Sequence, residues 1–271
     1  MRNIHIKIEY DGSGFHGWQF QPNVRTVQAV VEEVLSLVCA EEIHVHGTSR
    51  TDAGVHAYGQ HATFPLNSAI PVDRIPVAAN NILKDVKIVW AREEAPDFHA
   101  RYDAVGKTYI YRIALDGLRV GAHVRSALYD STDIFLRNYL LPVNYSLDIP
   151  AMQEAAKDFV GTHDFASFQA AGSQIIENTV RTISALTIGE RTRMDTKGNT
   201  CKELLVTVTG DGFLYNMVRI IVGTLLEVGR GRKSSADIKK IIGAKDRTFA
   251  GPTASPCGLY LFEVYYNSEG R

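Results

Sequence analysis

Residues 4–9, IHIKIE, alternate strictly between apolar and polar side chains. A period of two is typical of a β-strand with one buried face, so this segment predicts a strand. Thr26 is suited to cap a following helix, because residues 27–39 carry apolar side chains at helical spacing. The sequence thus predicts a half-buried strand followed by an amphipathic helix.

The same two patterns recur along the chain. In the first half they predict one more helix, at 72–83, and strands at 43–47, 60–64 and 86–91. In the second half they predict helices at 150–160, 213–229 and 234–242, and strands at 107–114, 181–188, 203–209 and 259–266. Each half then follows the order β-α-β-β-α-β of a ferredoxin-like unit, and the second half has an additional short helix, 234–242, before its last strand.

We therefore expect an α+β protein of two tandem, pseudo-duplicated ferredoxin-like halves with a mainly antiparallel sheet. The first half would span residues 1–106 and the second residues 107–271, with a ligand site in the cleft between them. Residues 115–148 are long for a connection and predict a protruding loop.

The composition is that of a globular protein, since 45% of the 271 residues are hydrophobic and 22% are charged. This balance excludes a disordered chain. The net charge of −1 indicates no polyanionic partner. Two segments are nevertheless basic: residues 101–125 hold five basic and two acidic groups, and residues 210–250 hold eight and four. Either they form a footprint for phosphates, or they are solvated faces.

No apolar run approaches the roughly 18 residues that a membrane span needs. The most apolar stretch, 213–228, is interrupted by polar and charged residues, and the N-terminal strand pattern leaves no signal-peptide core. Cys39, Cys201 and Cys257 lie far apart without paired spacing, which favours free thiols in a reducing compartment. We expect a soluble, cytoplasmic protein.

Two patterns superficially match a dinucleotide site and a metal site, but their details speak against both. Residues 12–17 match G-x-G-x-x-G, but a dinucleotide site needs the third glycine to open a helix, and a proline-containing segment intervenes. His44 and His46 alternate along a predicted strand without a carboxylate or cysteine at ligand spacing. Surface or hydrogen-bonded histidines are the better interpretation, also for His56 and His61.

The loop over residues 47–57, GTSRTDAGVHA, is short, polar and flanked by two predicted strands. Gly54 permits a tight turn that presents Asp52 outward, and Arg50 supplies a planar cation for a phosphate or a base. The alternative is an Asx-type hairpin turn with an incidental arginine. Spacing alone leaves both open.

Residues 49–57, SRTDAGVHA, resemble the catalytic signature of the TruA family of tRNA pseudouridine synthases. The resemblance covers essentially the whole chain, through further blocks in that family's order: Tyr10-Asp11-Gly12, Gly17-Trp18-Gln19, Thr26-Val27-Gln28, Phe98-His99-Ala100-Arg101, Lys107-Thr108-Tyr109, Gly161 with His163-Asp164-Phe165, Asn216-Met217-Val218-Arg219 and Gly258-Leu259-Tyr260-Leu261. Two features depart from the family pattern: Ser49 stands where glycine is common, and the stretch around 121–133 looks longer.

The resemblance implies a pseudouridine synthase fold and conversion of uridine to pseudouridine near positions 38–40 of the tRNA anticodon stem-loop. It implies no cofactor or metal, and a homodimer. Asp52 would be the nucleophile, attacking either the ribose or the base, with Arg219 as its ion-pair partner. Tyr109 would stack on the target base, Leu259 would line the base pocket, and Arg50 would fill the space of the flipped nucleotide or hold its phosphate.

Two alternatives come from other classes of protein. A non-catalytic RNA-binding module fits the ferredoxin-like pattern, although the aromatic RNP1 octapeptide is missing. A carboxylate hydrolase fits Asp52, although such an enzyme usually has a second acid facing the first, and the charge near this loop is Arg50.

Overall fold

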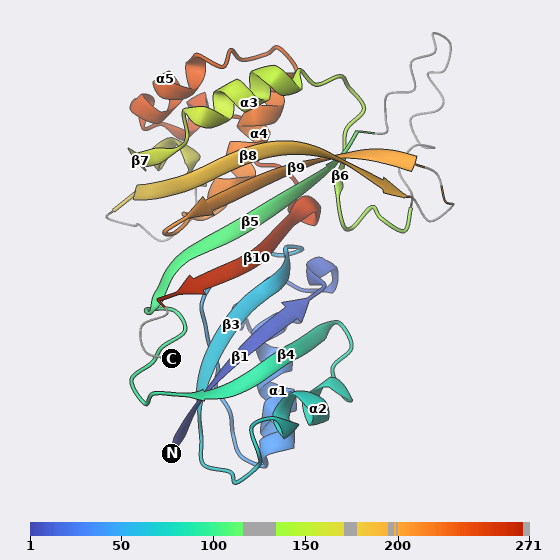
Figure 1. Ribbon diagram of the computed structural model, residues 1–271, viewed down its shortest axis with the longest axis vertical. Helices are drawn as coiled ribbons and strands as arrows, with labels where there is room; N and C mark the ends of the chain where they lie inside the picture. The colour runs from blue at the N-terminus through green and yellow to red at the C-terminus, as the bar shows by residue number, and fades with distance from the viewer. Residues whose placement is uncertain (116–133, 171–177, 195–197, 199, 268–271) are drawn as a thin grey trace. The chain divides into compact units, whose positions relative to one another are not determined.

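The computed structural model describes residues 1–115, 134–170, 178–194, 198 and 200–267 (Figure 1). By its internal contacts the chain divides into a first unit, Met1–Lys107 with Tyr260–Arg271, and a second unit, Thr108–Leu259. The predicted loop at 115–148 and the longer stretch around 121–133 fall largely or wholly outside the described residues. No described helix has the length and apolar character needed to cross a membrane.

The first unit is a sheet of mainly antiparallel strands with two helices (Figure 1). In chain order its elements are β1 (Arg2–Tyr10), α1 (Val27–Cys39), β2 (His46–Gly47), β3 (His56–Leu66), α2 (Arg74–Asn80), β4 (Val86–Glu94) and, much later, β10 (Leu259–Tyr266). β1 pairs antiparallel with both β3 and β4, and β2 pairs antiparallel with β3. The β-α-β-β-α-β order predicted for residues 1–106 is the order of these first six elements.

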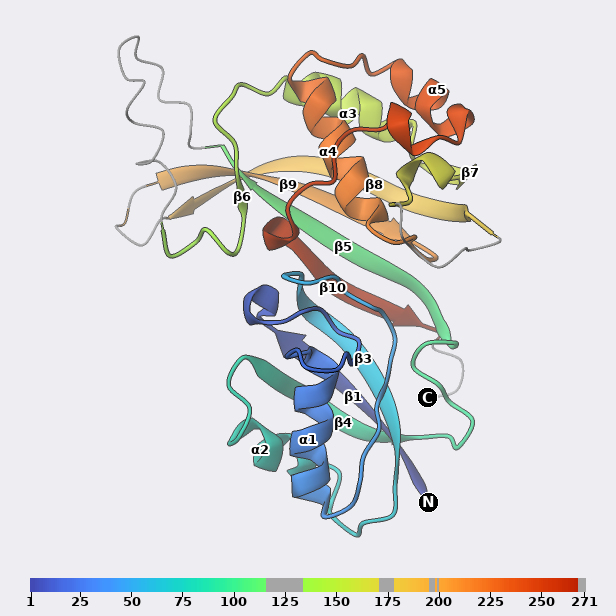
Figure 2. The same ribbon diagram turned by 180° about the vertical axis from the view of Figure 1, so that it is seen from behind.

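The alternation that predicted β1 also divides the two faces of its sheet. Ile4, Ile6 and Ile8 are fully buried. The helices α1 and α2 cover one face of this sheet, which Figure 2 shows from the helix side. Thr26 caps α1 as predicted, accepting a hydrogen bond from the amide of Ala29. Local sequence therefore places the helix start and the core face correctly.

β10 corrects the predicted division of the chain. The sequence assigned residues 259–266 to the second half, but β10 pairs parallel with β3, Tyr260 opposite His56 and Leu261 opposite Ala57. Residues from Tyr260 onward therefore group with the first unit. Strand pairing between segments 200 residues apart leaves no local signal.

β2 is shorter than the strand predicted at 43–47. The amide of Val45 donates to the Glu32 carboxylate (2.9 Å), and the amide of Ile43 donates to the Ser36 hydroxyl (2.9 Å). Both acceptors lie on α1. Because these side chains take backbone donors that a strand would need, the ladder begins only at His46.

The second unit combines a further mainly antiparallel set of strands with three helices on one side of it (Figures 1 and 2). In chain order its elements are β5 (Ala104–Ala114), which begins just before the unit boundary, β6 (Leu141–Pro142), α3 (Ile149–Lys157), β7 (Gly161–Asp164), β8 (Val180–Met194), β9 (Thr200–Gly210), α4 (Met217–Gly229) and α5 (Asp237–Ala244). The strand order is β5-β9-β8-β7, with β6 beside β5. The sequence did not predict the short strands β6 and β7.

α4 begins four residues later than predicted, at Met217 instead of Phe213. Asn216 precedes it with a φ of 59°, in the left-handed region that interrupts a helix. Arg219 consequently lies in the first turn of α4 and not in its middle. The helix then packs closely on a later loop, because a Cβ at Gly223 would lie 1.7 Å from the carbonyl oxygen of Pro252.

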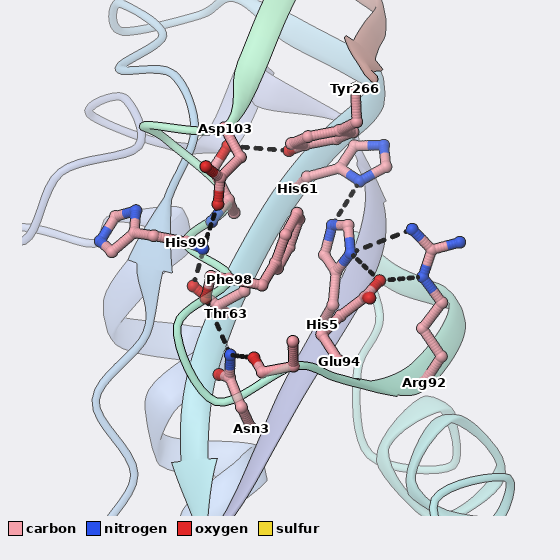
Figure 3. Close-up of polar contacts among 12 residues, drawn as sticks. Asn3, His5, His61, Thr63, Arg92, Glu94, Phe98, His99, Asp103 and Tyr266 are labelled. Atoms are coloured by element: carbon pink, nitrogen blue, oxygen red, sulfur yellow. Dashed lines mark hydrogen bonds and ion pairs between the residues drawn. The ribbon is translucent and has the colours of Figure 1, made fainter. Parts of the chain in front are cut away.

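The second face of the first-unit sheet holds a buried polar cluster (Figure 3). The imidazoles of His5 and His61 lie 2.8 Å apart, His5 Nε2 to His61 Nδ1. His5 Nδ1 lies 3.1 Å from Glu94, whose carboxylate also pairs with Arg92 at 2.6 Å. His61 is 4% exposed, and its burial, reinforced by the nearby positive charges, lowers its pKa to about 3.

This pKa predicts an acid-sensitive first unit. In the unfolded chain the His61 pKa is about 6.5, so below that pH the unfolded state binds a proton that the folded state does not. The free energy of unfolding should fall by about 1.4 kcal/mol per pH unit from this group between roughly pH 6 and pH 3. Urea unfolding at pH 7, 6, 5 and 4 measures it.

The control is the exposed histidine His44, whose side chain is 71% exposed. His61→Gln should flatten the pH dependence below pH 6, and His44→Gln should leave it unchanged. Equal slopes for wild type and His61→Gln would contradict the assignment of the acid sensitivity to His61.

Candidate active site

The loop that carries Asp52 joins β2 to β3 and is fixed at its first residues by buried side chains. The Thr48 amide donates to the carbonyl of His61 (2.8 Å). The fully buried Gln60 side chain then holds Ser49 from both sides: its oxygen accepts from the Ser49 amide (3.2 Å) and its nitrogen donates to the Ser49 carbonyl (2.7 Å). The loop thus leaves the strand in a defined direction.

The middle of the loop is held by the segment that follows β1. The Trp18 amide donates to the Thr51 carbonyl (3.0 Å), and the Tyr10 hydroxyl lies 2.7 Å from the Thr51 hydroxyl. Trp18 and Tyr10 are 2% and 5% exposed, so these contacts are shielded from water. Asp52 comes directly after this clamped residue.

Asp52 begins a tight turn. The Val55 amide donates to the Asp52 carbonyl (3.1 Å), and Gly54, with a φ of 76°, stands at the position of the turn that requires a positive φ. The Gly54 amide in addition donates to the Phe15 carbonyl (3.2 Å). Gly54 therefore has the role that the sequence predicted for it, and Asp52 lies half-buried on a turn anchored at both ends.

The glycines of the G-x-G-x-x-G segment at 12–17 allow its backbone to contact the backbone of the Asp52 loop. A Cβ at Gly17, whose φ is 88°, would lie 2.6 Å from the carbonyl oxygen of Thr51. A Cβ at Gly12 would lie 1.9 Å from the carbonyl oxygen of Val55. The sequence analysis weighed these glycines only as part of a dinucleotide site and missed that they allow the close contact with the Asp52 loop.

Arg50 is exposed, and its Nε donates to the side chain of Gln19 (3.0 Å). The guanidinium therefore lies at the surface of the Asp52 loop. His56, which begins β3, is instead structural: its Nδ1 accepts from the Gly12 amide (3.1 Å), and its ring stacks on Tyr260 with centroids 4.7 Å apart. This agrees with the hydrogen-bonded histidine that the sequence predicted.

The second unit carries the other three predicted site residues. Tyr109 on β5 is 8% exposed and meets Phe213 edge to face, with centroids 5.1 Å apart. Leu259, 5% exposed, is the first residue of β10. Asp52 and Arg50 belong to the first unit, so the ion pair of Asp52 with Arg219 stays a prediction.

Hydrogen bonds within the second unit help to orient Arg219 at the start of α4. Its Nε donates to the Ala254 carbonyl (2.7 Å), and one terminal nitrogen donates to the side chain of Asn216 (2.6 Å). The left-handed Asn216 thus has two effects, since it delays the helix and orients the guanidinium. Sequence reasoning missed the role of Asn216, although an asparagine directly before an apolar helix is a recognisable start signal.

Among the described residues no group of three or more His, Cys, Asp or Glu could hold a metal ion. The candidate site thus consists of Asp52 on a turn that is fixed by hydrogen bonds and of the exposed Arg50 two residues before it.

The family model for tRNA pseudouridine synthases matches residues 6–103 and 155–267, which is most of the chain. The chain belongs to the tRNA pseudouridine synthase family. Members of this family are isomerases, and the Asp52 loop and its Gly12–Gly17 seat both lie inside the first matched range.

Curated relatives are similar over almost the full chain. The tRNA pseudouridine synthase A of Ruminiclostridium cellulolyticum is 44% identical, covering 98% of this chain and all of the relative. That of Caldicellulosiruptor bescii is also 44% identical, and the tRNA pseudouridine synthase A 2 of Clostridium perfringens is 45% identical, each with the same coverage. Family membership favours an isomerase over both alternatives, the RNA-binding module and the hydrolase.

The close contact between Gly17 and the Asp52 loop predicts that a methyl group added at Gly17 lowers both stability and turnover. Gly17→Ala should destabilise the protein by about 1–3 kcal/mol, because alanine is strained at this φ and its Cβ meets the Thr51 carbonyl. The folded protein should also lose at least about tenfold in turnover of tRNA, because the loop must shift. Thermal unfolding and single-turnover assays measure the two effects.

Gly14→Ala is the matched control in the same segment. A Cβ there would meet only the end of the Arg25 side chain, at 3.3 Å, and that side chain can move. If Gly14→Ala lowered turnover as much as Gly17→Ala, the close backbone contact would not be what positions the loop.

Proposed function

We propose that the protein converts uridine to pseudouridine at positions 38–40 in the anticodon stem-loop of tRNA, with Asp52 as the nucleophile. The observation that carries this proposal is the anchored turn of Asp52 inside a chain of the pseudouridine synthase family. A carboxylate held on a tight turn meets its target at a fixed angle, which is the positional requirement of nucleophilic catalysis.

The reaction rearranges bonds within one nucleoside and needs no external reactant. The N1–C1′ glycosidic bond breaks, the uracil turns, and a C5–C1′ bond forms. The C5 proton leaves to solvent and N1 gains a proton, so substrate and product have the same composition. Asp52 attacks either the ribose or the base, and both routes use the same carboxylate.

The target uridine has to leave the helical stack before a carboxylate can reach it, which costs a few kcal/mol. Stacking on Tyr109 would offset part of this cost, at roughly 1–3 kcal/mol per base. Leu259 would line the base pocket, and Arg50 would occupy the vacated space or hold the phosphate. Arg219 would pair with Asp52 and favour its ionised form. The tandem ferredoxin-like duplication, with the site between the halves, belongs to the same proposal.

We propose further that the enzyme is cytoplasmic, works as a homodimer and uses neither a metal nor another cofactor. The basic segments at 101–125 and 210–250 would grip the RNA backbone, because an A-form stem is recognised largely by shape and phosphate contacts. Light scattering, and tRNA turnover in the presence of EDTA, test the dimer and the metal independence.

Asp52→Asn should retain the fold and tRNA binding but lower turnover by roughly three orders of magnitude or more, because the amide keeps the shape and loses the nucleophile. Release of tritium from C5-labelled uridine in tRNA measures turnover. Residual activity within tenfold of wild type would refute Asp52 as nucleophile. Release of free base or cutting of the strand would instead indicate a hydrolase.

The Asp52–Arg219 pair has its own test. If the two side chains pair, Arg219→Ala should slow the chemical step strongly, and the Asp52→Asn/Arg219→Ala double variant should be little slower than Asp52→Asn alone. If Arg219 only holds phosphate, its loss should weaken tRNA binding instead, and the two defects should add. Arg232→Ala, at an arginine 56% exposed beyond α4, is the control for a general loss of positive charge.

A further inference from the structure

Beside the Asp52 loop, the first unit exposes a row of rings that we name the ring platform: His46, His99 and Tyr102, with Arg101. The His46 and His99 ring centroids lie 5.5 Å apart, and those of His99 and Tyr102 lie 4.4 Å apart. The Arg101 guanidinium lies 5.8 Å from the Tyr102 ring. Tyr102 is 75% exposed, so the end of this row is open to solvent.

Three residues of the platform lie in a turn that hydrogen bonds hold together, and Figure 3 shows the contact of His99 with Asp103 in this turn. The amides of Tyr102 and Asp103 both donate to the His99 carbonyl at 3.1 Å, and the Asp103 carboxylate accepts from the His99 amide at 2.7 Å. Ala100 in the middle is fully buried, and its carbonyl accepts from the hydroxyl of Tyr266 at 2.9 Å. A ligand would therefore meet a pre-organised surface and pay little entropy to order it.

Two exposed groups of the platform have no polar partner among the described residues. Within the described ranges, the Arg101 guanidinium and the Tyr102 hydroxyl make no hydrogen bond or ion pair. The neighbouring Asp103 carboxylate accepts a hydrogen bond from the His99 amide, and among the described residues it makes no ion pair with Arg101. A cation and an aromatic face, both open to solvent, match the phosphate and the base of one nucleotide.

His99 is suited to stacking because it stays uncharged. Its Nδ1 accepts a hydrogen bond from the Arg101 amide at 3.1 Å, which leaves the ring proton on Nε2. Partial burial, helped by the neighbouring His46, lowers the pKa of His99. A neutral imidazole therefore packs against the Tyr102 ring and supports it at physiological pH.

The platform is tied to the catalytic loop through one residue. The Thr48 hydroxyl donates to the Ala100 carbonyl at 3.0 Å, and Thr48 is the residue from which the Asp52 loop departs. Three residues lie between Thr48 and Asp52, so four Cα–Cα steps limit the distance between their Cα atoms to about 15 Å. A ligand on the platform is thus within a few nucleotides of whatever Asp52 attacks.

We propose that the ring platform binds a nucleotide of the tRNA substrate a few positions from the target uridine. Its base stacks on the Tyr102 ring, which His99 supports from the other side, and its phosphate pairs with Arg101. The proposal rests on the tRNA substrate of the proposed function and adds to it a second point of attachment. It makes Arg101 and Tyr102 binding residues that take no part in the bond rearrangement.

The test measures equilibrium binding of unmodified tRNA in the Asp52→Asn background, where no turnover interferes. Tyr102→Ala should weaken binding at least fivefold, because one base loses its stacking partner. Tyr102→Phe keeps the ring and should bind within twofold of the parent. Thermal unfolding should be unchanged in both, because the Tyr102 side chain is exposed.

Salt dependence tests the phosphate contact separately. Arg101→Ala should lower the slope of log K against log salt by about 0.7 to 0.9, the value for one phosphate, and Arg101→Lys should keep it. Arg74→Ala is the matched control, because Arg74 is an exposed arginine on α2 and does not belong to the ring platform. It should change neither the affinity nor the slope.

The outcomes separate this proposal from the proposed function. Unchanged tRNA affinity in Tyr102→Ala and Arg101→Ala would overturn the platform and leave the proposed function standing, whereas a wild-type chain that bound no tRNA would overturn both. Unchanged affinity with a change in oligomeric mass in Tyr102→Ala would assign the surface to a protein contact instead. With Asp52 restored, Tyr102→Ala should raise KM and leave the rate at saturating tRNA within twofold of wild type.

Discussion

The candidate site depends on one close contact between two stretches of backbone. The segment after β1 touches the loop before β3 with no side chain between them, at Gly17 against Thr51 and at Gly12 against Val55. Hydrogen bonds from the Trp18 amide and to the Phe15 carbonyl cross the same contact. Because interiors are closely packed, a loop held in this way has little freedom to relax. The position of Asp52 follows from that lack of freedom.

In the second unit, backbone conformation likewise orients a charged side chain, that of Arg219. Asn216 takes a left-handed conformation, so α4 starts at Met217 and Arg219 falls in its first turn. The guanidinium then finds the Ala254 carbonyl and the Asn216 side chain. The Ala254 loop is itself fixed, because Gly223 allows Pro252 to lie against the helix. In both units, glycine permits a backbone approach that positions a charged residue.

Local patterns predicted what local interactions decide. The bounds of α1 were correct because the Thr26 cap and the apolar spacing both lie within the helix itself. The start of α4 was wrong because the apolar pattern extends through Phe213, whereas one left-handed residue decides where the helix can begin. The strand predicted at 43–47 was too long, because the Glu32 and Ser36 side chains on α1 accept hydrogen bonds from the backbone amides of its first residues.

The sequence by itself determined the order of the elements from β1 to β4, the cap of α1 and, through the SRTDAGVHA segment, the family to which the chain belongs. Periodicity, caps and motifs depend only on residues that are close together in the sequence, so they can be recognised without coordinates. Only the tertiary structure decided that Gly12 and Gly17 seat the Asp52 loop, that β10 pairs with β3, and that His61 is buried in a polar cluster. Each of these depends on contact between segments far apart in the chain, and the free energy of such a contact resides in packing that no single segment contains.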